Sequence, residues 1–168
     1  MLPRKFLLRC LVTVLVTCFG LMSIVLPAQA DSVEDRYITQ YLKASEPVPL
    51  TMNQQGETQM FSPQELYEGK QLFKENCINC HVGGSTLPDP SVSLSLADLK
   101  GATPPRDTVD GIVDYLRHPM SYDGNYETYW CREVPSSWMP RAKVNKLAAF
   151  ILRAAQKAPG WGTQQFDL

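Results

Sequence analysis

Apolar residues recur at helical spacing in three segments after residue 61. The first segment opens with SPQE at residues 62–65, where the serine can cap a helix, the proline suits its first turn and the glutamate completes a capping box. It continues to the cysteine pair at residues 77–80. The other two segments have these apolar positions: Val109, Ile112, Val113 and Leu116, followed by Pro119, and Val144, Leu147, Ala148, Ile151 and Leu152. The pattern therefore predicts three helices.

Gly69 interrupts the apolar pattern of the first predicted helix. A glycine inside a helix costs about 1 kcal/mol relative to alanine, so its presence needs a reason. A second helix that crosses there at close range would supply one, and a glycine that is simply tolerated is the alternative.

The rest of the chain has an extended or irregular pattern. Residues 48–52 and 57–61 are short extended runs on either side of a turn that contains glycine, which predicts a β-hairpin. Residues 31–46 have apolar positions at near-helical spacing and are expected to form a short helix or an ordered arm. Residues 83–106 and 120–140 are predicted to be loops, the first with at most a short helical turn. The expected fold class is all-α with a small N-terminal β-hairpin.

The first 30 residues have the layout of a secretory signal peptide. Three basic residues precede an apolar run at residues 11–26, and Ala28-Gln29-Ala30 provides an A-x-A cleavage site. The apolar run of roughly 16 residues is short for a bilayer span, which needs about 20. We expect cleavage after Ala30, with an uncleaved membrane anchor as the alternative. The expected domains are a signal peptide at 1–30, an N-terminal extension at 31–47 and a folded domain at 48–168.

Loss of the signal peptide changes the charge and the cysteine count. The whole chain has 16 basic and 17 acidic side chains, and removal of the three basic residues of the leader leaves a net charge of about −4. A mildly acidic domain is a poor match for nucleic acid or anionic lipid, and its expected complement is a basic docking surface. The cysteines that remain are Cys77, Cys80 and Cys131.

Residues 77–81 have the sequence CINCH, the C-x-x-C-H spacing of covalent haem attachment. Cys77 and Cys80 would bind one haem c through thioether bonds, and His81 would ligate its iron. A second C-x-x-C motif or Cys/His pair, which a structural zinc site would need, is absent from the sequence. His81 is expected to donate its other ring N–H to a backbone carbonyl of the following loop, with Pro88 and Pro90 as candidates.

Three side chains are candidates for the second axial position of the iron. Cys131 lies in a predicted loop and has no disulfide partner after cleavage; an inert buried thiol or an intermolecular disulfide is its alternative role. Met139 precedes the last predicted helix, and a haem-pocket or core methionine is its alternative role. His118 ends the second predicted helix, where a cationic side chain also suits the helix dipole. A second axial position with no protein ligand is the fourth alternative. The spacing of these residues along the sequence does not decide among the four.

Five stretches of the chain match one family of proteins: VPL at 48–50, EGKQLF at 68–73, CINCHVGG at 77–84, ATPPRDTVDGIVDYLRHPMSYDG at 102–124 and GWG at 160–162. They resemble the low-potential cytochrome c-550 family of cyanobacterial photosystem II, and most closely its c-550-like member. The resemblance implies a single-haem cytochrome c fold in the thylakoid lumen, with peripheral membrane association through proteins. It assigns Cys77 and Cys80 to haem attachment and His81 to the proximal position.

The resemblance also bears on the second axial ligand. Family members bind the iron with a histidine shortly after the YDG stretch, but residues 129–136 of this chain contain no histidine. Cys131 lies within one residue of the aligned position. His118 falls where the family commonly has asparagine, and Met139 lies in a segment that does not bind iron in the family. The comparison therefore favours Cys131.

The expected function is that of a low-potential c-type cytochrome, a one-electron carrier and not an enzyme, associated with photosystem II or with a redox partner protein. A thiolate ligand would stabilise ferric iron and lower the potential. The alternatives are a haem enzyme, a small-molecule sensor with a displaceable ligand, and a structural photosystem subunit. The longer N-terminus at residues 31–46 and the ending at 163–168 depart from the family. These two departures leave open how the protein docks on the photosystem. Its oligomeric state is also open, with a homodimer as one alternative to a monomer.

Overall fold

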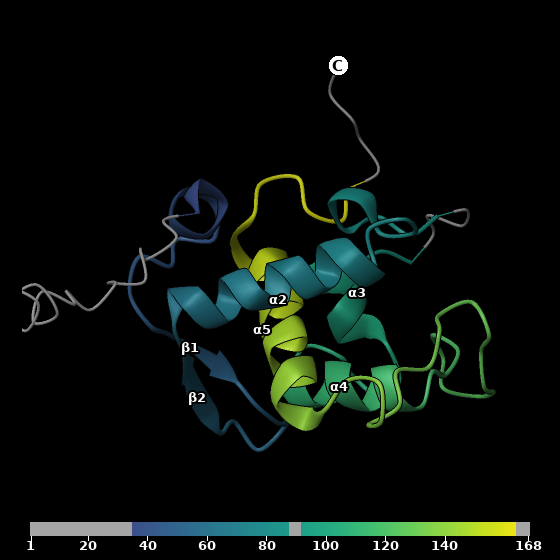
Figure 1. The fold of residues 1–168 in the computed structure, drawn as a ribbon. Helices are drawn as coiled ribbons and strands as arrows, with labels where there is room; N and C mark the ends of the chain where they lie inside the picture. Colours follow the sequence, from purple (N-terminus) through teal and green to yellow (C-terminus); the bar gives the residue numbers. More distant parts are fainter. Residues whose placement is uncertain (1–34, 88–91, 164–168) are drawn as a thin grey trace, which may run out of the picture. The chain divides into compact units, whose positions relative to one another are not determined.

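The computed structural model describes residues 35–87 and 92–163. The predicted signal peptide, Pro88 and Pro90 lie outside the described residues. The elements follow in the order η1 (Tyr37–Tyr41), β1 (Val48–Thr51), β2 (Thr58–Phe61), α2 (Pro63–Asn76), η2 (Val82–Gly84), α3 (Leu96–Gly101), α4 (Val109–Arg117) and α5 (Arg141–Lys157). The mostly helical fold with one antiparallel hairpin confirms the predicted class (Figure 1).

Side chains cap the starts of three helices. The Ser62 hydroxyl accepts a hydrogen bond from the backbone N–H of Glu65, whose carboxylate accepts one from the backbone N–H of Ser62, so the predicted capping box of α2 is present. Ser95 caps α3 and Thr108 caps α4 through their hydroxyls. α4 ends before Pro119, whose ring cannot continue a helix.

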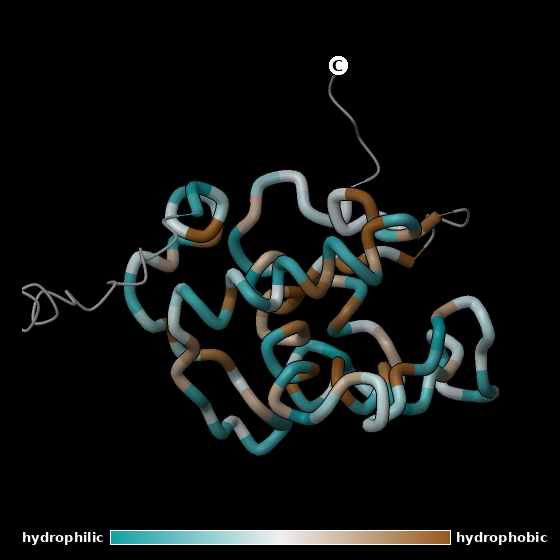
Figure 2. Tube along the Cα trace, in the orientation of Figure 1, coloured by the Kyte–Doolittle hydropathy of each residue, from teal (hydrophilic) through white to brown (hydrophobic). Residues whose placement is uncertain are grey.

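The apolar stripes predicted for the two later helices are buried. All four predicted positions of α4 and all five of α5 face the core. Hydrophobic and hydrophilic residues alternate along these helices, as an amphipathic period requires (Figure 2). Within the described residues, no helix is long and apolar enough to span a membrane.

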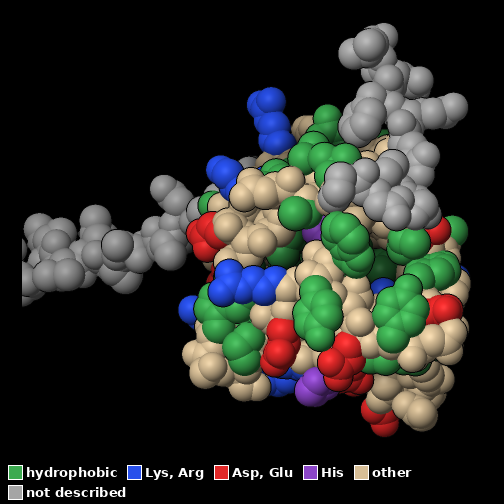
Figure 3. All heavy atoms as spheres, turned by 90° about the vertical axis from the view of Figure 1, so that its right-hand side faces the viewer, with side chains coloured by type: hydrophobic (Ala, Val, Ile, Leu, Met, Phe, Trp, Pro, Cys, Tyr) green, Lys and Arg blue, Asp and Glu red, His purple; other side chains and the backbone are tan. Residues whose placement is uncertain are grey.

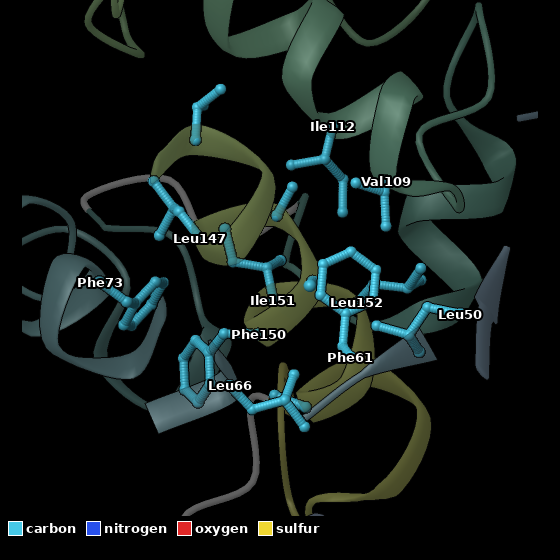
Figure 4. Close-up of a cluster of buried hydrophobic side chains, with 14 of the residues drawn as sticks. Leu50, Phe61, Leu66, Phe73, Val109, Ile112, Leu147, Phe150, Ile151 and Leu152 are labelled. Carbon is cyan, nitrogen blue, oxygen red and sulfur yellow. The ribbon is translucent and has the colours of Figure 1, made fainter. Parts of the chain in front are cut away.

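α2 crosses α5 close to Gly69 (Figure 1). A Cβ atom at this position would lie 2.0 Å from the backbone oxygen of Lys146 and 2.8 Å from the Cβ atom of Phe150, both in α5. The close crossing predicted from Gly69 is confirmed. Side chains from the hairpin, α2, α4 and α5 form the surrounding core (Figure 4): Leu50, Phe61, Leu66, Phe73, Val109, Ile112, Leu147, Phe150, Ile151 and Leu152.

Residues 35–47, the N-terminal arm, are ordered and contain one short π-helical turn, η1. The buried Arg153 of α5 holds the arm, because its guanidinium donates to the backbone oxygens of Leu42 and Lys43 at 2.7 and 2.8 Å. At the start of the arm, the Asp35 carboxylate lies 2.6 Å from the Lys70 ammonium of α2. The described part of residues 31–46 therefore has both predicted features, a short helical element within an ordered arm.

Candidate haem site

A cavity of about 660 Å³ lies between the end of α2, α4, α5 and the loop that joins α4 to α5. Cofactor sites commonly have volumes of about 300–1,000 Å³. The inner wall is apolar and includes Phe73 from α2, Leu116 from α4 and Ile151 from α5. Hydrophobic side chains surround a hollow on the face that carries this loop (Figure 3). The cavity thus has the size and the lining of a site for a large apolar cofactor.

The end of α2 places the C-x-x-C-H motif on one side of this cavity. Backbone hydrogen bonds continue past the last helical residue, since Cys77 donates to Phe73 and His81 donates to Cys77. This extra turn brings the thiols of Cys77 and Cys80 and the imidazole of His81 to the same cavity. Burial, with the neighbouring thiols Cys131 and Cys80 as smaller causes, raises the pKa of Cys77 to about 12. Cys77 is therefore a neutral thiol at pH 7.

His81 is held with one ring nitrogen engaged by protein. Its Nδ1 lies 3.1 Å from the backbone oxygen of Ser85 and 3.3 Å from the hydroxyl of Thr86. A carbonyl can only accept, so Nδ1 carries the proton and Nε2 keeps a lone pair for a metal. Burial lowers the pKa of His81, which favours this neutral form. The predicted backbone acceptor is therefore a residue of the following loop, Ser85, rather than either proline candidate.

A tight turn makes the Ser85 contact possible. Gly83 and Gly84 have φ angles of +59° and +83°, which few residues other than glycine adopt. A Cβ atom on Gly84 would also lie 2.7 Å from the ring of Trp161, which belongs to the C-terminal GWG stretch. The backbone N–H of Gly162 donates to Gly83 at 2.8 Å. The end of the described chain therefore packs on the turn that positions His81.

Cys131 lines the same cavity from the loop between α4 and α5. It is close enough to the motif that Cys131 contributes to the raised pKa of Cys77 and that Cys80 contributes to the raised pKa of Cys131. Burial raises the pKa of Cys131, while a hydrogen bond from the Tyr115 hydroxyl and the nearby Arg106 guanidinium act in the opposite direction. Burial also raises the pKa of Tyr115, so its hydroxyl remains protonated and can donate.

The other two candidates for the second axial position lie in different places. Met139 is buried, with 2% of its surface exposed, and it lines the same cavity as the motif. His118 is exposed at the end of α4 and borders a separate depression with Asp110 and Asp114. The structure thus brings Cys131 and Met139 together with the C-x-x-C-H motif, but not His118.

Two cavity residues, Arg106 and Tyr115, were not identified from their chemistry in the sequence. Both belong to the ATPPRDTVDGIVDYLRHPMSYDG stretch, which matched the family without any role for either side chain. Tyr115 follows Ile112 by three positions, so its place on the inner side of α4 could have been expected from the helical period. Arg106 lies in irregular backbone before α4, and no local pattern there predicts a buried cation.

These residues fit a haem. The cavity offers two thiols at C-x-x-C spacing, a neutral imidazole with a free nitrogen and an apolar wall. Solved structures of similar proteins agree: the PsbV2 cytochrome from Thermosynechococcus elongatus is 58% identical, with a TM-score of 0.76 over 77% of this chain and 98% of that one. Cytochrome c549 is 34% identical, with a TM-score of 0.58 over 64% and 90% of the two chains. The fold and the site define a c-type cytochrome.

Within that class the chain belongs to the cytochrome c-550 family, whose domain matches residues 38–168. A cytochrome c-550-like protein of Thermosynechococcus vestitus is 53% identical over 156 residues, which cover 89% of each chain. Another, from Trichodesmium erythraeum, is 49% identical over 98% of each chain. The photosystem II extrinsic protein V of Gloeobacter violaceus is 53% identical over 138 residues, 82% of this chain and 74% of that one.

Proposed function

We propose that the chain is a low-potential one-electron carrier of the thylakoid lumen. Cys77 and Cys80 would hold a single haem covalently, and His81 and Cys131 would bind its iron. The observation that carries this proposal is the Cys131 thiol on the wall of the cavity that contains the C-x-x-C-H motif. When bound, the haem supplies a reversible ferric–ferrous couple.

The residues around the cavity would set the properties of that couple. Ser85 fixes the ring orientation of His81 through Nδ1 and makes the imidazole a better donor. The sulfur of Cys131 would bind as an anion, which favours the ferric state over the ferrous one. The apolar wall excludes water from the site. With His81 and Cys131 both bound, the iron would have no position left for a substrate, so the site would be suited to electron transfer rather than to substrate chemistry.

Cys131 is a better candidate than Met139 because of what surrounds each sulfur. A hydroxyl donor, Tyr115, and a buried cation, Arg106, lie next to Cys131 and would stabilise a negatively charged sulfur. Met139 belongs to the hydrophobic core, and its backbone oxygen accepts a hydrogen bond from Arg117 at 2.7 Å. A core position suits a neutral packing residue.

Substitution of Cys131 tests the proposed ligation. We expect Cys131→Ala and Cys131→Ser to change the absorption and EPR spectra of the ferric holoprotein, and to raise its reduction potential, because the anionic donor is lost. The control variants Met139→Leu and His118→Gln should keep the wild-type spectra. The ferrous wild type should also bind carbon monoxide slowly or not at all, whereas Cys131→Ala should bind it rapidly.

Unchanged spectra of Cys131→Ala would exclude Cys131 as a ligand. Rapid binding of carbon monoxide by the wild type would instead support the alternative of a sensor or haem enzyme with a displaceable ligand.

The partner proposed for this cytochrome is the lumenal surface of photosystem II or a redox protein near it. The support is the similarity to relatives named photosystem II extrinsic protein V, together with the cytochrome c-550 domain. Association with the membrane would be peripheral and through proteins. A structural contribution to the photosystem is the second function consistent with those names, and an assembled complex with a redox-silent haem would favour it.

A further inference from the structure

Arg106 is a buried arginine fixed by backbone oxygens rather than by an acid. Only 9% of its surface is exposed, and one of its terminal nitrogens donates to the backbone oxygens of Met120 and Ser121 at 3.0 and 2.8 Å. None of the ion pairs among the described residues includes it. A buried positive charge without an acidic partner is costly, so it should have another electrostatic role.

The guanidinium of Arg106 lies over the ring of Tyr115, with its central carbon 3.9 Å from the ring centroid. This is cation–π geometry, and it fixes the tyrosine on the cavity side of α4. A nearby positive charge also draws electron density from the ring, which makes the phenol hydroxyl a stronger hydrogen-bond donor. The sulfur of Cys131 lines the same cavity, and the two side chains are close enough to affect each other's pKa, which places the sulfur within reach of this hydroxyl.

The loop that carries Cys131 is exposed just before this residue, whereas after it Arg132 lies over the Trp138 ring and the backbone N–H of Val134 donates to Leu116. Tyr129 and Trp130, the two preceding residues, have 93% and 87% of their surfaces exposed. The sulfur itself has only a distant backbone acceptor, the oxygen of Arg132 at 3.9 Å. A hydrogen bond from Tyr115 would therefore join this part of the loop to a helix whose core face is fully packed.

We propose that Tyr115, held in place by Arg106, is a positioning residue that donates a hydrogen bond to the sulfur of Cys131 and thereby sets the reduction potential. The inference rests on the proposed function, in which this sulfur is an iron ligand. A hydrogen bond to a ligating sulfur withdraws electron density from it, so the sulfur becomes a weaker donor and the ferric state is less favoured. The bond should raise the potential above that of an unsupported thiolate, and it should hold the sulfur in one position.

The test compares Tyr115→Phe with Tyr126→Phe in the covalently loaded protein. Tyr126 also lines the cavity but is 65% exposed and has no bond to Cys131, so it is a matched control. We expect Tyr115→Phe to keep its haem and thermal stability, to have a more negative reduction potential and to show altered low-spin EPR values. Tyr126→Phe should match the wild type in all of these. A potential and spectrum unchanged in Tyr115→Phe would overturn the proposal.

A double-mutant cycle separates this inference from the proposed ligation. In the Cys131→Ala background, Tyr115→Phe should not shift the potential, because the acceptor sulfur has been removed. An equal shift in both backgrounds would show that Tyr115 acts by another route and would refute its proposed role. If Cys131→Ala alone leaves the spectra unchanged, the ligation itself fails.

Pulsed EPR gives a readout of the hydrogen bond besides the reduction potential. Pulsed EPR of the ferric protein in H₂O and D₂O should detect an exchangeable proton coupled to the iron centre through the sulfur. This signal should be missing in Tyr115→Phe. A wild-type spectrum with no exchangeable proton beyond that of the His81 Nδ1–H would also contradict the hydrogen bond.

Discussion

Gly69 shows how a single position can be dictated by packing. Alanine is the better helix former by about 1 kcal/mol, so local preference favours replacement of this glycine. The crossing of α2 and α5 favours glycine instead, because a methyl group at residue 69 would overlap the backbone oxygen of Lys146, 2.0 Å away. Backbone atoms cannot rotate out of the way as the end of a side chain can, so the helices would have to separate.

At the residue scale we therefore predict that Gly69→Ala destabilises the fold by about 2 kcal/mol, within the range of overpacked cores. Lys74→Ala, an exposed change on the same helix, should alter stability by less than about 0.5 kcal/mol. Urea unfolding followed by far-UV circular dichroism measures both. A variant Gly69→Ala as stable as the wild type would mean that α2 and α5 can move apart without loss.

At the scale of elements, the N-terminal arm is held by apolar side chains that enter the core, Ile38 and Leu42, and by polar contacts at its start. Burial alone would raise the pKa of Asp35, but hydrogen bonds from the Lys70 ammonium and the Tyr37 backbone N–H outweigh it and lower the pKa below the ordinary 3.8. A carboxyl whose pKa is lowered by folding stabilises the folded state while it is ionised. This contribution is complete above about pH 4 and is lost as the pH falls through the lowered pKa.

We predict that Asp35→Asn lowers stability by about 0.5 kcal/mol at pH 7, a magnitude typical of ion pairs that remain partly exposed. The difference from the wild type should shrink as the pH falls below about 4 and should vanish once the pH is well below the lowered pKa of Asp35, where the wild-type carboxyl is protonated as well. Thermal unfolding across this pH range measures the difference. The exposed Glu46→Gln in the same arm is the control, and it should show no such trend. A pH-independent difference for Asp35→Asn would disprove the ionic origin of the contact.

At the scale of the whole molecule, the cavity makes stability depend on its occupant. A volume of about 660 Å³ with a largely apolar wall is far larger than the occasional voids of a packed interior. Without a cofactor, Phe73 and Leu116 would lose contacts that other core residues have on all sides.

We therefore predict that Cys77→Ser combined with Cys80→Ser gives a protein that melts at a clearly lower temperature and binds a hydrophobic dye such as ANS. Cys131→Ser is the matched control, since it also replaces a cavity thiol but retains both attachment cysteines. It should keep the haem and most of the stability. Calorimetry and dye fluorescence report the outcome, and an unchanged melting temperature in the double variant would show that the cavity collapses without cost.

Local signals explain why much of the fold could be predicted. The capping box at Ser62 and Glu65 and the stop at Pro119 act within one or two helical turns, so short stretches of sequence reveal them. The hairpin followed from two extended runs around a turn with glycine. The short helix α3 and the cap Thr108 were not specified, because six residues of helix in a loop rich in small residues give no clear period.

The candidate site was only partly predictable. The C-x-x-C-H motif is contiguous, so Cys77, Cys80 and His81 could be assigned from spacing, and they line one cavity. The acceptor for His81 depends on a left-handed glycine turn, which allows Ser85 to fold back sooner than the expected prolines. His118 was a reasonable candidate by residue type, but α4 presents it outside the cavity that contains the motif.

The sequence by itself determined what depends on neighbours along the chain: the helix boundaries, the hairpin and the cysteine spacing that predicts haem attachment. The tertiary structure decided which distant residues meet. It placed Cys131 and Met139, but not His118, on the cavity with His81, and it brought Arg106 over Tyr115. The physical reason is the distance along the chain over which each effect acts. Helix capping and hydrophobic periodicity act over a few residues, whereas a cavity is formed by packing among helices and loops that are far apart in the chain.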